Sequence, residues 1–135
     1  MTLKTPQTTS DNDKAGRTPD ALEQQLVLEL RRGLITLTVL GALRQPAYGY
    51  SLRQHLAENG FEVDQGTLYP LLRRLDGQGL LDSDWNTEGA RPRKYYRLNA
   101  RGSAMLETLR GHWHAMAEVV ETLFASSDSE EGDTP

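Results

Sequence analysis

Apolar residues at helical spacing mark residues 63–80 as a helix with one buried face. Four leucines recur there at i, i+3, i+4 and i+7: Leu68, Leu71, Leu72 and Leu75. Asp64 is a suitable N-cap whose carboxylate can accept a backbone N–H, and Gly79 can take the left-handed conformation that ends a helix. The opposite face carries small, aromatic and basic side chains: Gln65, Gly66, Thr67, Tyr69, Arg73 and Arg74. That face suits a phosphate-lined groove, because helix N-termini and guanidinium groups favour phosphate oxygens.

Two more helices are predicted in the N-terminal part of the chain. Residues 20–32 form a helix that begins at Pro19-Asp20 and whose leucines recur at i, i+4 and i+8: Leu22, Leu26 and Leu30. Gly33 is expected to break or bend this helix. Residues 34–43 are apolar nearly all round, which is typical of a central buried helix. Their β-branched residues would also suit a strand, but the length and the flanking sequence favour a helix.

A helix-turn-helix unit is predicted from residues 48–58 together with the helix at 63–80. Leu52 and Leu56 face inward in the first of these helices, and Asn59-Gly60 ends it. Residues 45–47, which precede it, are expected to form a turn. Two short helices joined by a short turn are typical of DNA-binding domains.

A β-hairpin is predicted after the helix-turn-helix unit. Residues 81–86 and 93–98 each alternate between the two faces of a strand. The loop between them, residues 87–92, is too long for a two-residue turn, so it is expected to project as a wing. Trp85, Tyr96 and Leu98 are expected to pack the wing onto the domain.

A long C-terminal helix is predicted from Asn99, a suitable N-cap, to about Ala125. Its apolar residues repeat as a heptad, with Leu106, Trp113 and Val120 at one position and Leu109, Met116 and Leu123 at the other. This stripe is wider than a small domain can cover, which predicts oligomerisation. We expect a homodimer whose interface contains Leu22, Leu26, Leu106, Leu109, Trp113, Val120 and Leu123.

The chain ends and the composition limit the number of domains and the class of protein. Residues 1–19 and 126–135 are polar and are expected to be disordered tails, the second of them acidic. The 135 residues, 37% of them hydrophobic, allow one domain with one modest core. The lack of cysteine excludes disulfides and thiolate zinc sites, and no apolar run suits a membrane span or a signal peptide. We therefore expect a soluble, cytoplasmic protein.

The net charge of −4 conceals an uneven distribution of charge. Residues 31–101 contain 11 Lys and Arg against 7 Asp and Glu, so the acidic excess lies toward the ends of the chain. The wing and the residues after it carry basic side chains without an acidic residue among positions 89–101: Arg91, Arg93, Lys94, Arg97 and Arg101. Together with the basic face of the helix at 63–80, this cluster favours phosphate binding over a merely solvated surface. Tyr50 and Tyr69 suit DNA contacts and half-buried core positions equally well.

The sequence does not indicate a catalytic or metal site. His112 and His114 lie two positions apart on a helix, so they point to nearly opposite sides and cannot bind one metal ion. No Ser or Thr is placed with a His and an acid, and neither a glycine-rich phosphate loop nor a paired-carboxylate motif occurs. We predict no enzymatic activity, no metal and no cofactor.

Three motifs in order resemble the PadR family of bacterial winged-helix transcriptional regulators, in its short form. They are Tyr48-Gly49-Tyr50, the run from Gly66 to Leu75 and the run from Arg91 to Leu98, and with residues 30–34 the resemblance covers about residues 26–124. It implies a transcriptional repressor that a small ligand releases from DNA. Joined to the basic cluster, it predicts the DNA-binding residues Tyr50, Gly66, Thr67, Tyr69, Arg73, Arg74, Arg91, Arg93 and Lys94.

Trp113 has two alternative interpretations. As a heptad residue it would be ordinary dimer core. Some regulators that this family resembles stack flat apolar ligands on an aromatic residue of the dimerisation helix, which makes Trp113 a candidate for ligand contact. A pliable pocket for a small aromatic or apolar effector would then comprise Met105, Leu109, Trp113 and Met116.

These inferences give one prediction of fold and function. The fold is mainly α, with a winged helix-turn-helix domain over residues 20–98, including an extra helix at 20–32 and a two-stranded β wing, and a long C-terminal dimerisation helix over residues 99–125. The function is DNA-binding transcriptional regulation by a dimeric repressor on an inverted-repeat operator. The alternative is a winged-helix protein–protein interaction module that does not bind DNA.

Overall fold

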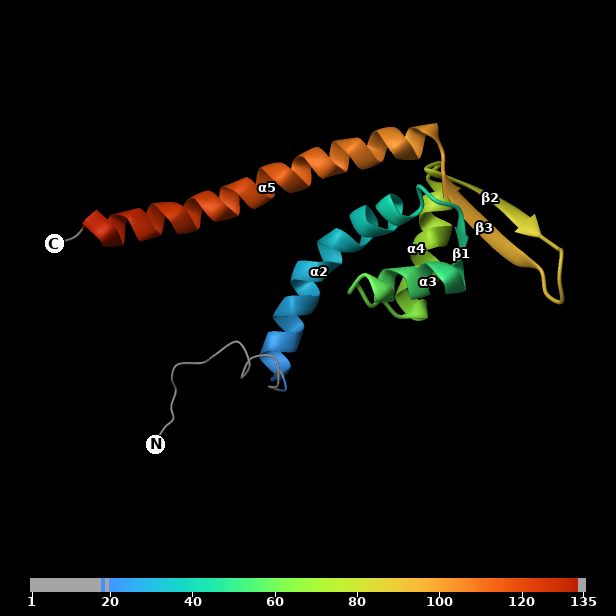
Figure 1. The fold of residues 1–135 in the computed structure, drawn as a ribbon, viewed down its shortest axis with the longest axis horizontal. Helices are drawn as coiled ribbons and strands as arrows, with labels where there is room; N and C mark the ends of the chain where they lie inside the picture. The colour runs from blue at the N-terminus through green and yellow to red at the C-terminus, as the bar shows by residue number, and fades with distance from the viewer. Residues whose placement is uncertain (1–17, 19, 134–135) are drawn as a thin grey trace. The chain divides into compact units, whose positions relative to one another are not determined.

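The computed structural model describes Thr18 and residues 20–133, with side chains to Ser126. Figure 1 shows its elements in chain order: α2 (Ala21–Ala42), β1 (Ala47–Tyr48), α3 (Gly49–Glu58), α4 (Gln65–Gly77), β2 (Leu81–Asn86), β3 (Arg93–Leu98) and α5 (Ala100–Asp133). This is the predicted mainly α winged-helix architecture with a long C-terminal helix. The chain divides into two compact units after Leu34, and the core and groove described below belong to the second unit, Ile35–Pro135. None of the described helices is long and apolar enough to cross a membrane.

Helix α2 is continuous, so the expected break at Gly33 is wrong. One glycine inside a helix costs about 1 kcal/mol relative to alanine, and the helix formers on both sides tolerate that cost. The last turns of α2 enter the core through Val39 and Leu40, which are fully buried. The apolar residues at 34–37 are only partly buried, so this segment is less enclosed than its composition predicts.

Helix α4 buries the predicted leucine face completely. Each of its four buried leucines is at most 5% exposed: Leu68, Leu71, Leu72 and Leu75. Gly79 closes the C-terminal end as predicted, with a φ of 81° in the left-handed region. Asp64 occupies the N-cap position, but its Oδ1 accepts the hydroxyl of Thr67 at 2.9 Å and no backbone N–H. The predicted backbone cap is therefore wrong, although the helix begins where the sequence places it.

The sheet has three antiparallel strands in the order β1-β3-β2, one strand more than predicted. β2 and β3 pair from Leu81 opposite Leu98 to Asn86 opposite Arg93. With the connecting loop at residues 87–92 they form the wing, which Figure 1 shows as a hairpin projecting beyond α3 and α4. The additional strand β1 pairs with Tyr95 and Tyr96 of β3 in a segment that the sequence predicts as a turn. Two residues are too few to show an alternating pattern.

A core rich in leucine joins the last turns of α2 to α3, α4, the sheet and the first turns of α5. Its buried members are Val39, Leu40, Leu43, Leu52, Leu56, Leu68, Leu71, Leu72, Leu75, Leu80, Leu81, Tyr96 and Leu106. Tyr96 is buried and Leu98 is partly buried, as predicted. Trp85 is 65% exposed, so the expectation that it packs onto the domain is wrong. Its strand position, opposite Lys94 near the end of the ladder, lies beyond the reach of the core.

Helix α5 begins at Asn99, whose Oδ1 accepts the backbone N–H of Gly102 at 2.8 Å, as the predicted N-cap requires. It continues to Asp133, past the predicted end at Ala125, so the segment expected to be an acidic tail is helical as far as residue 133. The tail predicted for residues 1–19 lies outside the described residues, apart from Thr18.

The first turns of α5 belong to the core of their own chain. Leu106 is 4% exposed, and Leu109 packs partly against the buried cluster. Both residues were expected in the stripe that a small domain cannot cover, and for these two residues that expectation is wrong. The heptad pattern is the same for a helix that packs within its chain and for one that packs on a partner.

Gly102 allows α5 to approach the end of α4 and the start of β2. A Cβ atom at this position would collide with the carbonyl oxygen of Leu80 and lie 2.7 Å from Cδ1 of Leu98. Since a backbone oxygen cannot move aside without disturbing the strand, we predict that Gly102→Ala lowers the free energy of unfolding by about 3 kcal/mol. Chemical denaturation followed by circular dichroism measures this change.

The matched control is Gly111→Ala, on the same helix, where a Cβ atom would meet nothing within 4 Å. That substitution is expected to raise the free energy of unfolding by about 1 kcal/mol, because alanine favours helix. Equal effects of the two substitutions would show that α5 does not pack closely on Leu80.

Candidate nucleic-acid interface

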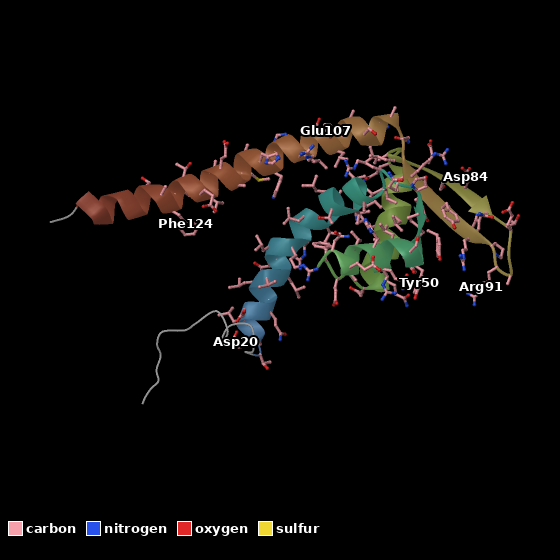
Figure 2. The ribbon with its side chains drawn as sticks, viewed as in Figure 1. Asp20, Tyr50, Asp84, Arg91, Glu107 and Phe124 are labelled. Atoms are coloured by element: carbon pink, nitrogen blue, oxygen red, sulfur yellow. The ribbon has the colours of Figure 1, made fainter. Side chains whose placement is uncertain are left out.

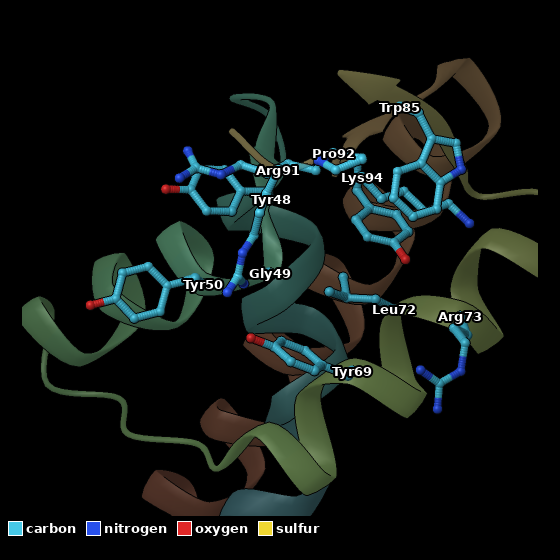
Figure 3. A pocket seen from close by; sticks show the side chains of 12 residues that line it. Tyr48, Gly49, Tyr50, Tyr69, Leu72, Arg73, Trp85, Arg91, Pro92 and Lys94 are labelled. Carbon is cyan, nitrogen blue, oxygen red and sulfur yellow. The ribbon is translucent and has the colours of Figure 1, made fainter. Parts of the chain in front are cut away.

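A groove of about 770 Å³ lies between α4 and the wing. We call it the wing groove, and Figure 3 shows the side chains that converge on it from α3, α4 and the sheet. It is lined by Tyr48, Gly49, Tyr50, Tyr69, Leu72, Arg73, Trp85, Arg91, Pro92, Arg93, Lys94 and Tyr96. The lining therefore combines aromatic rings with basic side chains and contains no acidic residue.

Helix α4 contributes one wall of the wing groove. Leu72 is buried beneath it, which fixes the rotation of the helix and turns Arg73 outward. The ring of Tyr69 packs against Gly49, where a methyl group would lie 2.5 Å from the ring Cε1. Arg73 is exposed and makes no ion pair with any described residue. Its guanidinium group is thus available to a phosphate.

Helix α3 begins beside this wall. Ser51 fixes its first turn, because the Ser51 hydroxyl accepts the backbone N–H of Tyr48 at 3.2 Å and donates to the Tyr48 carbonyl at 2.9 Å. Tyr50, in the same turn, is 53% exposed, and its hydroxyl accepts a hydrogen bond from Nε2 of Gln54 at 3.0 Å. Tyr50 and Tyr69 were each predicted to be either a DNA contact or a half-buried core residue. Tyr69 is half-buried, and Tyr50 faces solvent (Figure 2).

The wing contributes two arginines without acidic partners. The Arg93 guanidinium carbon lies 4.5 Å from the ring centre of Tyr48, a cation–π contact, and Tyr48 in turn meets the edge of Tyr95 with ring centres 5.2 Å apart. Arg91, near the end of the wing loop, is exposed and pairs with no acid among the described residues (Figure 2). Both charges remain unneutralised at the rim of the groove.

Lys94 is held between the wing and α4. Its ammonium nitrogen lies 3.7 Å from Oδ2 of Asp76, and the same carboxylate oxygen accepts the hydroxyl of Ser83 at 2.9 Å. The ammonium group also lies 5.6 Å from the ring centre of Tyr96 and 6.0 Å from that of Trp85. Asp76 therefore ties both strands of the wing to α4, and Lys94 carries a partly compensated charge into the groove.

Arg97, on the face of β3 opposite to Lys94, is neutralised by two aspartates of β2. Its Nη1 donates to Oδ2 of Asp84 at 2.8 Å, and its Nη2 lies 3.7 Å from Oδ2 of Asp82. The hydrogen bond to Asp84 and the charge of that carboxylate raise the pKa of Arg97 above its usual value. Residues 89–101 are thus free of acid only in the sequence, because β2 places two aspartates beside Arg97.

The wing groove brings together most of the predicted DNA-binding residues. Those that line it are Tyr50, Tyr69, Arg73, Arg91, Arg93 and Lys94. Gly66, Thr67 and Arg74 lie elsewhere on α4, where all three are exposed. Tyr48 and Trp85 were missed as site residues. Trp85 was expected to pack onto the domain together with Tyr96, because alternation along a strand does not show how far the core extends.

The predicted dimer and effector residues lie on two helices. Leu22 and Leu26, on the first part of α2, are 63% and 51% exposed. Beyond Leu109, α5 exposes a run of large apolar side chains: Trp113, Met116, Val119, Val120, Leu123 and Phe124. Trp113 is 39% exposed, and its indole lies 4.7 Å from the ring centre of His114. Among the described residues no group of His, Asp and Glu is arranged to hold a metal ion.

Comparison with known proteins identifies relatives of this chain. Residues 37–108 match the model of the transcriptional regulator PadR-like family. A transcriptional regulator of Mycobacterium tuberculosis, Rv3488, is 38% identical over 79 residues, which are 58% of this chain and 74% of that protein.

Solved structures give the same result. The crystal structure of a PadR family transcriptional regulator from Eggerthella lenta is 46% identical, with a TM-score of 0.74 over 76% of this chain and 92% of that one. A PadR-like transcriptional regulator from Bacillus cereus is 28% identical, with a TM-score of 0.64 over 71% of this chain and 96% of that one. The matched family region contains α3, α4, the wing and the first turns of α5.

Proposed function

Because the chain belongs to the PadR-like family of transcriptional regulators, we propose that it regulates transcription by binding duplex DNA in the wing groove. The observation that carries the proposal is the set of three arginines around the groove, Arg73, Arg91 and Arg93, none of which pairs with an acid among the described residues. Guanidinium groups on two walls of a groove suit a sugar-phosphate strand between them.

Each wall has its own part in this proposal. Helix α4 enters the major groove, where Arg73 reaches a base edge or a phosphate, and Gly66 and Thr67 allow close approach of the first turn. Tyr50 contacts the sugar-phosphate backbone of the DNA beside α4. Arg91, Arg93 and Lys94 hold the strand from the wing, and Arg74 contributes to the positive field of α4.

Some basic residues of the wing form an ion pair with an acidic residue and others do not. Salt titration can distinguish these two classes. Each phosphate contact contributes about 0.9 to the slope of log affinity against log salt. Arg93→Ala is therefore expected to lower that slope by about 0.9 and to weaken binding to every sequence. Arg97→Ala is expected to leave the slope unchanged, because Asp84 already holds its guanidinium group.

Fluorescence anisotropy with a labelled duplex at several salt concentrations measures both slopes. The two variants remove the same charge from the same strand, so a general effect of net charge would lower both equally. That outcome would remove the wing from the DNA interface. A wild-type protein that binds an acidic protein but no duplex would instead favour the interaction-module alternative.

The protein acts as a homodimer in this proposal. Support comes from the exposed large apolar residues of α5 beyond Leu109 and from those on the first part of α2, since runs of exposed apolar side chains often mark an interface. A two-fold dimer places two α4 helices on successive major grooves, roughly 34 Å apart or a multiple of that distance, which predicts an inverted-repeat operator. The resemblance to the PadR family implies a repressor, which would block transcription by occupying such a site.

Leu123→Asp tests the dimer without disturbing the core, because Leu123 is 66% exposed. The introduced carboxylate would be buried without a partner in a dimer but solvated in a monomer. Sedimentation of the variant is expected to show a folded monomer. Ala125→Asp, at an exposed position two residues along the same helix, serves as the control and is expected to remain dimeric. Dimers in both variants would place the interface elsewhere.

A flat apolar effector is proposed to bind near Trp113 and to release the DNA. Trp113 and Met116 are exposed on the α5 face assigned to the dimer, together with Met105, and Leu109 marks the edge of the core. A hundredfold loss of operator affinity requires about 2.7 kcal/mol of preference for the dimer form that does not bind DNA. One stacked aromatic ring system can supply this preference.

Titration of planar aromatic dyes against wild type and Trp113→Ala tests this effector site. The variant is expected to bind the dyes more weakly and to keep its operator affinity when they are added. Equal binding by both proteins, or binding without any change in operator affinity, would leave Trp113 as dimer core only.

A further inference from the structure

We propose that Trp85 is a DNA contact whose indole packs against a deoxyribose of the strand held in the wing groove. The inference rests on the function proposed above and adds to it an apolar contact that neither the sequence motifs nor the family assigns. Trp85 lines the groove and is 65% exposed, although it is the largest side chain of the wing. A tryptophan side chain is well suited to an interface, because its large apolar face gains free energy on leaving water.

The indole is held in a defined place. Trp85 pairs with Lys94 across β2 and β3, and the Lys94 ammonium group lies 6.0 Å from the indole. Asp76 of α4 fixes that ammonium group from the other side at 3.7 Å. Figure 3 shows Trp85 and Lys94 together above Leu72, with Arg73 on the adjoining helix. An apolar wall therefore stands on the same groove as the unpaired arginines.

The chemistry of the groove selects its occupant. The unpaired charges of Arg73, Arg91 and Arg93 favour an anion, and the indole favours an apolar surface on the same molecule. A nucleic-acid strand supplies both, because phosphates alternate with sugars whose C–H groups face outward along the grooves. An acidic peptide or a second copy of this chain would cover the indole differently, and the test below separates them.

The test uses the Trp113→Phe protein, in which Trp85 is the only remaining tryptophan, once sedimentation and duplex affinity have been shown to match those of the wild type. The probes are a duplex selected from a random pool by the wild-type protein and, as a polyanion without sugars, inorganic polyphosphate. The duplex is expected to protect the Trp85 fluorescence from acrylamide, whereas polyphosphate at saturation is expected to leave it accessible. Accessibility of Trp85 should not change with protein concentration in the absence of DNA.

Substitution gives the second readout. Trp85→Ala is expected to lower duplex affinity about tenfold at fixed salt, with Trp85→Phe retaining most of the affinity. The salt slope is expected to stay at the wild-type value in both variants, because no phosphate contact is lost. Since Trp85 is exposed, the free energy of unfolding should change little, and thermal denaturation checks this.

Four results would overturn the proposal while leaving DNA binding intact. The first three are equal protection by duplex and polyphosphate, duplex affinity of Trp85→Ala within about twofold of wild type, and shielding of the indole by a second copy in DNA-free protein. A lower salt slope in Trp85→Ala would also overturn it, because the side chain would then act only by positioning Lys94. Failure of the wild-type protein to bind any duplex would refute the proposed function itself, and this inference with it.

Discussion

The buried leucine face of α4 is the constraint on which the rest of this structure depends. Leu68, Leu71, Leu72 and Leu75 hold the helix against α2, α3 and the sheet, and burial of each side chain stabilises the fold by about 1.5–3 kcal/mol. Because these residues occupy one face, the rotation of α4 about its axis has no freedom. The outward direction of Arg73 is thus a consequence of hydrophobic packing.

Electrostatic pairing decides which basic residues present a free charge. Asp76 and the two aspartates of β2 compensate Lys94 and Arg97, whereas no described acid approaches Arg73, Arg91 or Arg93. The exposed pair at Arg97 adds little to stability, because solvent screens it. Its main effect is to remove one cation from the surface field, so the positive potential is concentrated on the groove and not spread over the whole wing.

Much of the fold could be predicted because its strongest signals are local. The leucine spacing of α4, the alternation of β2 and β3, Gly79 as helix stop and Asn99 as helix start each depend on a few neighbouring residues. The candidate site was predicted where motifs and charge coincided. Six of the groove residues were named in advance, among them Arg73 and Arg93.

The errors arose where the answer depends on distant residues. Nothing near Lys94 in the sequence shows that Asp76 will face it, because the contact requires the wing to fold back on α4. The heptad of α5 could not tell that Leu106 packs within its own chain. The strand position of Trp85 gave its face but not its distance from the core. Each of these features is determined by tertiary packing, which the local periodicity of the sequence does not predict.

Asn99 joins α5 to the winged-helix domain in a way that has a mechanical consequence. Its side chain amide donates to the carbonyl of Gly79 and to Asp82, while its Oδ1 caps α5, so one residue connects the end of α4, the start of β2 and the base of the long helix. Helix α5 extends roughly 50 Å from that point at 1.5 Å per residue, and only its first turns are embedded in the core. Because α5 is long and is anchored only at this end, a tilt of a few degrees about Asn99 would displace its far end by several ångströms. The anchor of α5 is thus the same residue that holds together the ends of two elements bordering the wing groove.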